Sequence, residues 1–141
     1  MKKFLAAACC LGLVILPAFP FGSAGSCLAA GPVLIDVLYM NHGPMQPTLE
    51  QMRSTFSRFG DKIQVGWHDF ESEEGAAFKA EKGIKTHVPL QIWLDGKDTR
   101  VVGGKTVRFF GFPTGAGPGF FQGQWSLNDL STAIEALITG R

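Results

Sequence analysis

The sequence predicts an α/β domain, because segments with the pattern of strands alternate along it with segments with the pattern of helices. The clearest strand signal is the nearly continuous apolar run at 33–39, which is typical of a buried central strand. The clearest helix signal follows at 45–59, where apolar residues recur at steps of three and four. The chain has 141 residues, a length that suits one domain.

Further elements continue the alternation. A second strand is expected at 63–70. A short helix at 72–82 is expected to begin with Ser72 as its N-cap, and Gly83 follows its end. A third strand is expected at 90–94, directly after a proline. These elements give the order strand, helix, strand, helix, strand.

The last part of the chain adds a glycine-rich stretch and a final helix. The stretch 97–119 contains two short β-prone pieces, at 101–102 and 106–112. The helix is expected to start at Ser126 with a pattern that resembles a capping box, and to end at Gly140. We find no internal repeat and no second domain in this order of elements.

The charge of the chain excludes two classes of partner. The formal net charge is +1, and no run of lysine and arginine exceeds two residues. A protein that binds nucleic acid or an acidic membrane surface needs a basic patch or stripe. We therefore expect no nucleic-acid partner. With 45% hydrophobic residues, the chain is expected to be globular.

The N-terminus has the pattern of an export signal. Two lysines precede an uncharged apolar stretch at 4–21, and mostly small residues follow it. Three positions suit a cleavage site: Ala24, Ala29 and Ala30. We therefore expect 1–30 to be a signal peptide, 31–141 to be the domain, and the protein to be periplasmic or extracellular.

Two alternatives to a simple cleaved signal stay open. The residues 24–27 resemble a lipoprotein box, which would place a lipid anchor on Cys27. The apolar stretch is also long enough for a short membrane anchor, although Pro17 and Pro20 argue against a continuous helix. After signal cleavage no membrane span is expected.

The cysteines restrict the chemistry of the domain. All three, Cys9, Cys10 and Cys27, lie in the first 27 residues. The domain therefore has no thiol for a disulfide framework, a zinc–thiolate site, an iron–sulfur cluster or a catalytic cysteine.

The residues after the first predicted strand resemble the thioredoxin family. In that family a buried aspartate on the strand is followed by a C-G-P-C motif at a helix N-terminus. Here Asp36 is followed six residues later by His42-Gly43-Pro44-Met45, so the glycine and proline are kept and both cysteines are replaced. The segment 83–89 is similar to the family's turn into the third strand, one residue longer, and 121–126 resembles its last strand.

The resemblance implies a thioredoxin-like fold, in which helices flank a central mixed β-sheet and 97–119 is an insert in the last β-hairpin. It also implies a cis peptide bond between Val88 and Pro89. Because the third strand would run away from the motif, the insert is expected to form a second surface, separate from the motif groove. Its Phe-rich piece would pair there as an extra ribbon.

The departures from the motif decide which functions carry over. Dithiol–disulfide exchange needs two thiols, and imidazole and thioether cannot form that disulfide. The groove that family members use to hold an extended peptide does not need these two thiols. We therefore expect a redox-inactive module that binds an exported protein or peptide partner, with no resident cofactor. The groove would be lined by His42, Gly43, Pro44, Met45, His87, Val88 and Pro89.

Two other functions are open. Thioether and imidazole form a soft donor set that suits Cu(I), so Met40, His42 and Met45 are the candidate ligands of a copper-binding or copper-delivery protein. An enzyme with His42 as a base is less supported, because no partnered nucleophile or second acid is evident. The alternative for Met45 is core packing on the helical stripe.

Two polar residues have simpler interpretations. Asp36 matches the family's buried carboxylate, and without a thiol to serve it is expected to be either a relic or the partner of a nearby polar group. His68 is expected to form a surface pair with its neighbour Asp69.

Overall fold

The computed structural model of the chain describes residues 31–141. The predicted signal peptide 1–30, with its cleavage sites and Cys27, lies outside the described residues. The elements are β1 (Val33–Tyr39), α1 (Gln46–Ser57), β2 (Ile63–Asp69), α2 (Glu73–Lys82), β3 (Leu90–Leu94), β4 (Thr99–Val102), β5 (Lys105–Arg108) and α3 (Leu127–Thr139). Short 3₁₀ turns lie at Gly43–Met45, Gly60–Lys62 and Gly119–Phe121.

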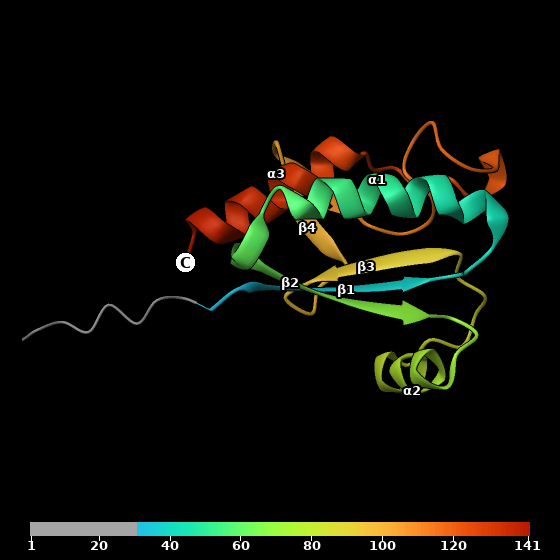
Figure 1. Ribbon diagram of the computed structural model, residues 1–141. Helices are drawn as coiled ribbons and strands as arrows, with labels where there is room; N and C mark the ends of the chain where they lie inside the picture. The colour runs from blue at the N-terminus through green and yellow to red at the C-terminus, as the bar shows by residue number, and fades with distance from the viewer. Residues whose placement is uncertain (1–30) are drawn as a thin grey trace, which may run out of the picture.

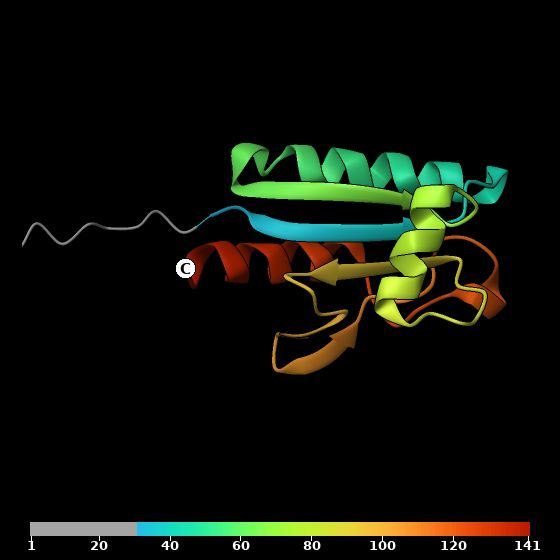
Figure 2. The same cartoon turned by 90° about the horizontal axis from the view of Figure 1, so that it is seen from below.

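The sheet is mixed, which confirms the α/β class. β1 lies in the centre of the order β2-β1-β3, parallel to β2 and antiparallel to β3. The outer edge of β3 is covered by residues 109–111, because the amide of Ile92 donates to the Phe109 carbonyl and the amide of Gly111 donates to the Leu90 carbonyl. β4 and β5 form a separate antiparallel hairpin that extends beyond this edge (Figure 2).

Helices cover both faces of the sheet. α1 and α3 lie side by side on one face and α2 lies on the other (Figure 1). The inward residues of β1 alternate between the two faces, as they must in a strand. Val33, Ile35 and Val37 enter the main core under α1 and α3, whereas Leu38 joins a small cluster with Phe78 and Trp93 under α2.

The local signals at helix ends are confirmed. The Ser72 hydroxyl accepts from the amide of Gly75, and Gly83 ends α2 in the left-handed conformation at φ 67°. Ser126 forms a complete capping box with Asp129 at the start of α3. The first predicted helix differs, because its expected start at Met45 belongs to a 3₁₀ turn and the α-helix begins at Gln46.

The sequence predicts that the glycine-rich stretch 97–119 forms one inserted unit, but in the structure it divides into two parts. The hairpin β4–β5 ends at Arg108, and the next residues pair with β3 because the Phe109 side chain is fully buried in the main core. The last strand expected at 121–126 does not form. In this segment only Gln122 pairs like a strand residue, in a single parallel bridge to Phe112.

None of the helices within 31–141 is both long enough and apolar enough to cross a membrane.

Candidate functional site

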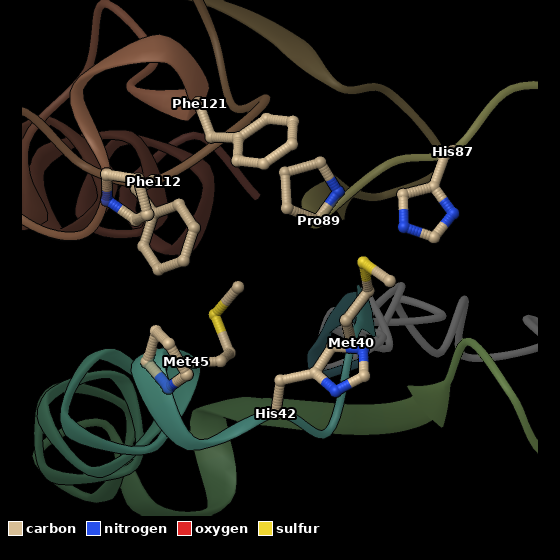
Figure 3. A pocket seen from close by; sticks show the side chains of 9 residues that line it. Met40, His42, Met45, His87, Pro89, Phe112 and Phe121 are labelled. Carbon is tan, nitrogen blue, oxygen red and sulfur yellow. The ribbon is translucent and has the colours of Figure 1, made fainter.

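The candidate site is an apolar pocket at the end of the sheet where β1 ends and β3 begins (Figure 3). Its volume is about 180 Å³. Seven apolar side chains and two imidazoles line it, namely Met40, His42, Pro44, Met45, His87, Pro89, Phe112, Pro118 and Phe121. No lysine, arginine or carboxylate is among these residues, so the pocket suits an uncharged, apolar group.

The end of β1 is held against the start of β3 by one backbone hydrogen bond. The amide of Met40 donates to the carbonyl of Pro89 over 3.0 Å. The chain then turns, because the amide of His42 donates to the Met40 carbonyl (2.9 Å) and the amide of Met45 donates to the His42 carbonyl (2.9 Å). These bonds place both methionines and His42 at the same pocket.

Met45 belongs to the pocket and to the core at once. Met45 is 2% exposed and packs in the main core under α1 and α3, so the core packing expected for it is confirmed. The Met45 side chain also forms the side of the pocket that faces Phe112 (Figure 3). Met40 is nearly as buried, at 6%, and lies on the other side of the pocket, below His87.

The glycine-rich stretch provides the wall that sequence reasoning missed. Phe112 and Pro118 of this stretch line the pocket, together with Phe121 just after it, so the prediction that 97–119 forms a surface separate from the motif groove is wrong. The amide of Phe112 donates to the Phe121 carbonyl (2.9 Å), which folds the chain back on itself. A signal was present in the sequence: no charged residue occurs between Arg108 and Asp129.

The predicted cis bond is also wrong, since no peptide bond among residues 31–141 is cis. The trans form is the ordinary state of a bond before proline, favoured by roughly 0.5–1 kcal/mol. The preceding loop, one residue longer than the family's, reaches β3 with this ordinary bond. Val88 points away from the pocket and lines a different cavity, on the α2 face with Ile84 and Trp93. Gly43 is exposed and does not line the pocket.

The two imidazoles of the pocket lie on separate loops. The His42 side chain is 53% exposed, and its Nε2 lies 3.7 Å from the Glu71 carboxylate. His87 contacts the Phe70 ring edge to face, with ring centroids 5.3 Å apart. The hydrogen bonds found among the described residues include none to either imidazole. Both rings are therefore available to a ligand at the mouth of the pocket.

Asp36 lies away from the pocket, on the α2 face of the sheet. Its side chain is 31% exposed, so the expected buried carboxylate is wrong, and its Oδ1 lies 3.2 Å from Nε2 of His68, so it is the partner of a polar group. The expected pair of His68 with Asp69 is wrong, because adjacent residues of a strand point to opposite faces. Gly66 of β2 pairs with Asp36 of β1, and a Cβ on Gly66 would lie 3.0 Å from the Asp36 carboxylate. Glycine at this position leaves room for the pair.

His68 is held on its other sides as well. Its ring stacks on Phe78 with centroids 3.8 Å apart, and its Nδ1 lies 3.8 Å from the Glu74 carboxylate. Within 31–141 no group of three or more histidine, cysteine or carboxylate side chains is placed to hold a metal ion.

Comparisons with family models, with curated proteins and with solved structures gave no match for this chain.

Proposed function

We propose that the protein is an exported, redox-inactive module of the thioredoxin-like class that binds an extended protein or peptide partner. One apolar side chain of the partner enters the pocket beside His42 and Pro89. The observation that carries the proposal is the pocket itself, which is uncharged, about 180 Å³ in volume and open to solvent between two loops.

The order of elements supports the thioredoxin-like class. A central strand that is parallel to one neighbour and antiparallel to the next, with helices on both faces, agrees with the topology that the resemblance implies. The motif His42-Gly43-Pro44-Met45 lies directly after this central strand, at the start of α1. The trans bond before Pro89 removes one feature of the resemblance, so the class rests on topology and on the motif.

The loop before β3 offers a backbone for pairing. Among the described residues, no backbone hydrogen bond holds residues 85–88, although the segment ends at the pocket with His87 and Pro89. An extended peptide laid along this loop would gain main-chain hydrogen bonds and place alternate side chains toward the protein. One of them would reach the pocket.

The binding experiment uses blocked pentapeptides of glycine and serine with one central residue, either leucine, phenylalanine, alanine or aspartate. Binding is followed by NMR shifts of the pocket residues. Leucine has three more carbons than alanine and each buried CH₂ contributes about 0.8 kcal/mol, so central leucine should bind at least about tenfold more tightly than alanine even where it is only partly buried. Aspartate should bind most weakly, because the pocket offers a carboxylate no cation.

Two neighbouring phenylalanines provide the matched variants. Phe121 lines the pocket, whereas Phe120 is 83% exposed and does not. Phe121→Ala should weaken leucine-peptide binding at least about fivefold, the loss of a contact worth about 1 kcal/mol. Phe120→Ala should leave it unchanged. Equal effects of the two variants, or equal binding of the leucine and aspartate peptides, would contradict the proposal.

Export is tested separately. Cell fractionation followed by mass spectrometry of the N-terminus distinguishes the expected outcomes. A new N-terminus after Ala24, Ala29 or Ala30 supports signal cleavage, and a lipid on Cys27 supports the lipoprotein alternative. Recovery of the uncleaved chain in the cytosol would contradict export.

A further inference from the structure

The two methionines of the pocket differ in their surroundings. Figure 3 shows the Met40 thioether directed toward His87, with the His42 ring below it beside the same side chain, while the Met45 side chain lies across the pocket and points toward Phe112. Met40, His42 and His87 come from the end of β1, the turn after it and the loop before β3. The hydrogen bonds from the Met40 amide to Pro89 and from the His42 amide to Met40 fix these segments together.

The three donors make a soft set. Thioether sulfur selects Cu(I) over harder cations, and neutral imidazole nitrogen is a good copper ligand. Met40 is 6% exposed, so its sulfur lies in an apolar environment that disfavours the more strongly hydrated Cu(II) ion. The imidazoles of His42 and His87 line the same pocket as Met40 and are the nitrogen donors that would complete the set.

The charges around the mouth favour a cation. No lysine or arginine lines the pocket. The Glu71 carboxylate lies 3.7 Å from Nε2 of His42, where it would hold the imidazole and attract a positive ion. Lys79 is occupied elsewhere, because its ammonium donates to the Phe70 carbonyl over 2.6 Å.

We propose that Met40, His42 and His87 form a Cu(I) site at the mouth of the pocket. Met45, which the sequence had placed in the ligand set, is a pocket wall and not a ligand. This site does not depend on the proposed binding of peptide, and Phe121→Ala, which tests the peptide, should leave it intact.

The test measures Cu(I) affinity of the untagged full chain without oxygen, in a mild detergent, by competition with the chelator bicinchoninate. Cys9, Cys10 and Cys27 are replaced by serine in every protein, so that thiols do not compete. Met40→Leu, His42→Gln and His87→Gln should each weaken binding at least about tenfold, since even residues that only support a ligand cost that much. Met45→Leu is the matched control, and should change affinity less than twofold.

X-ray absorption of the copper-loaded protein provides a second, independent readout. One sulfur and two imidazole nitrogens around the copper support the proposed set. Two sulfurs and one imidazole would overturn it in favour of Met40, His42 and Met45. A Met40→Leu protein that binds Cu(I) like its parent, or a parent that fails to compete with the chelator, would also overturn it. Circular dichroism of each variant shows that it is folded.

Discussion

Two consecutive parts of the chain between β3 and α3 are held in place in different ways. The first, 97–108, contains the hairpin β4–β5 and five charged residues. The second, 109–125, is called the return segment here; it contains no charged residue. The hairpin extends away from the sheet, and the return segment runs back to the end of the sheet that holds the pocket (Figure 2).

The hairpin is attached through Asp98. This carboxylate accepts hydrogen bonds from Nε2 of Gln91 (2.9 Å), Nε of Arg108 (2.8 Å) and the hydroxyl of Thr99 (3.1 Å). The strands also place Val102 and Val107 in the main core, whereas Val101 is 70% exposed. The polar contacts of Asp98 are local and weaken with salt.

The return segment is attached through buried aromatic rings. Phe109 and Trp125 are 0% and 1% exposed and meet edge to face with centroids 5.6 Å apart. The indole Nε1 of Trp125 donates to the carbonyls of Phe110 and Gly111. The difference shows that aromatic packing in the core holds the wall of the pocket, whereas the hairpin adds only Val102 and Val107 to the core and also depends on the polar contacts of Asp98.

The largest effect should separate these two attachments. Trp125→Ala removes a buried ring and two hydrogen bonds, so it should lower the free energy of unfolding by about 3–5 kcal/mol. Val101→Ala in the hairpin should change it by less than about 0.5 kcal/mol. Denaturation in urea measures both. A small effect of Trp125→Ala would mean that the return segment is not part of the cooperative core.

A second pair of variants sharpens the comparison at the backbone. Gly104 in the hairpin and Gly111 in the return segment have similar φ values, 79° and 74°. A Cβ at Gly104 meets nothing within 4 Å, whereas a Cβ at Gly111 would lie 2.5 Å from the Phe121 carbonyl oxygen. Gly104→Ala should therefore lower the free energy of unfolding by only about 1–2 kcal/mol, the strain of an alanine in the left-handed conformation.

Gly111→Ala should lower the free energy of unfolding by about 1–3 kcal/mol more than Gly104→Ala does, because the backbone at Gly111 and the backbone at Phe121 must move apart. It should also weaken the binding of the leucine peptide, since that movement displaces the Phe121 backbone at the pocket. Urea denaturation and the NMR titration check the two effects. Equal losses of stability in Gly104→Ala and Gly111→Ala would show that close packing of the return segment contributes nothing.

The elements predicted correctly are those whose signals are local. The strands at 33–39 and 90–94 match β1 and β3, and the cap at Ser72 is formed as expected. A cap, a stripe or an apolar run is decided by neighbours within a few residues, so the sequence displays it directly. The same holds for the motif at His42, which lies where the end of β1 puts it.

The features missed depend on contacts between distant residues. Asp36 and His68 meet because parallel pairing of β1 with β2 puts Gly66 between them, and a register cannot be read from either strand alone. Phe112 and Phe121 reach the pocket through a reversal of the chain at the glycine-rich residues 115–119, whose position beside the pocket cannot be read from the local sequence. The sequence placed His87 in the groove but not among the copper ligands, because its position above Met40 depends on how the loop before β3 folds.

The smallest effect concerns the charge that attaches the hairpin. Partial burial acts to raise the pKa of Asp98, but hydrogen bonds from Arg108, Thr99 and Gln91 outweigh it and hold the pKa below its ordinary value of 3.8. Since the folded state binds the proton less tightly than the unfolded state, this carboxylate stabilises the protein above pH 3.8, and the contribution is lost as the pH falls through the lowered pKa.

Asp98→Asn should therefore reduce stability at neutral pH, by less than about 1 kcal/mol for so exposed a pair. The difference from the parent should shrink as the pH falls below 3.8. Urea denaturation at a series of pH values measures it.

Asp95 provides a second carboxylate of this kind. Partial burial would raise its pKa, but hydrogen bonds from Arg141 and the Leu34 amide hold that pKa below 3.8, so the contribution of Asp95 should persist in Asp98→Asn. Because the hairpin does not line the pocket, the variant should bind the leucine peptide and Cu(I) like the parent. A loss of either would show that the hairpin and the return segment are coupled.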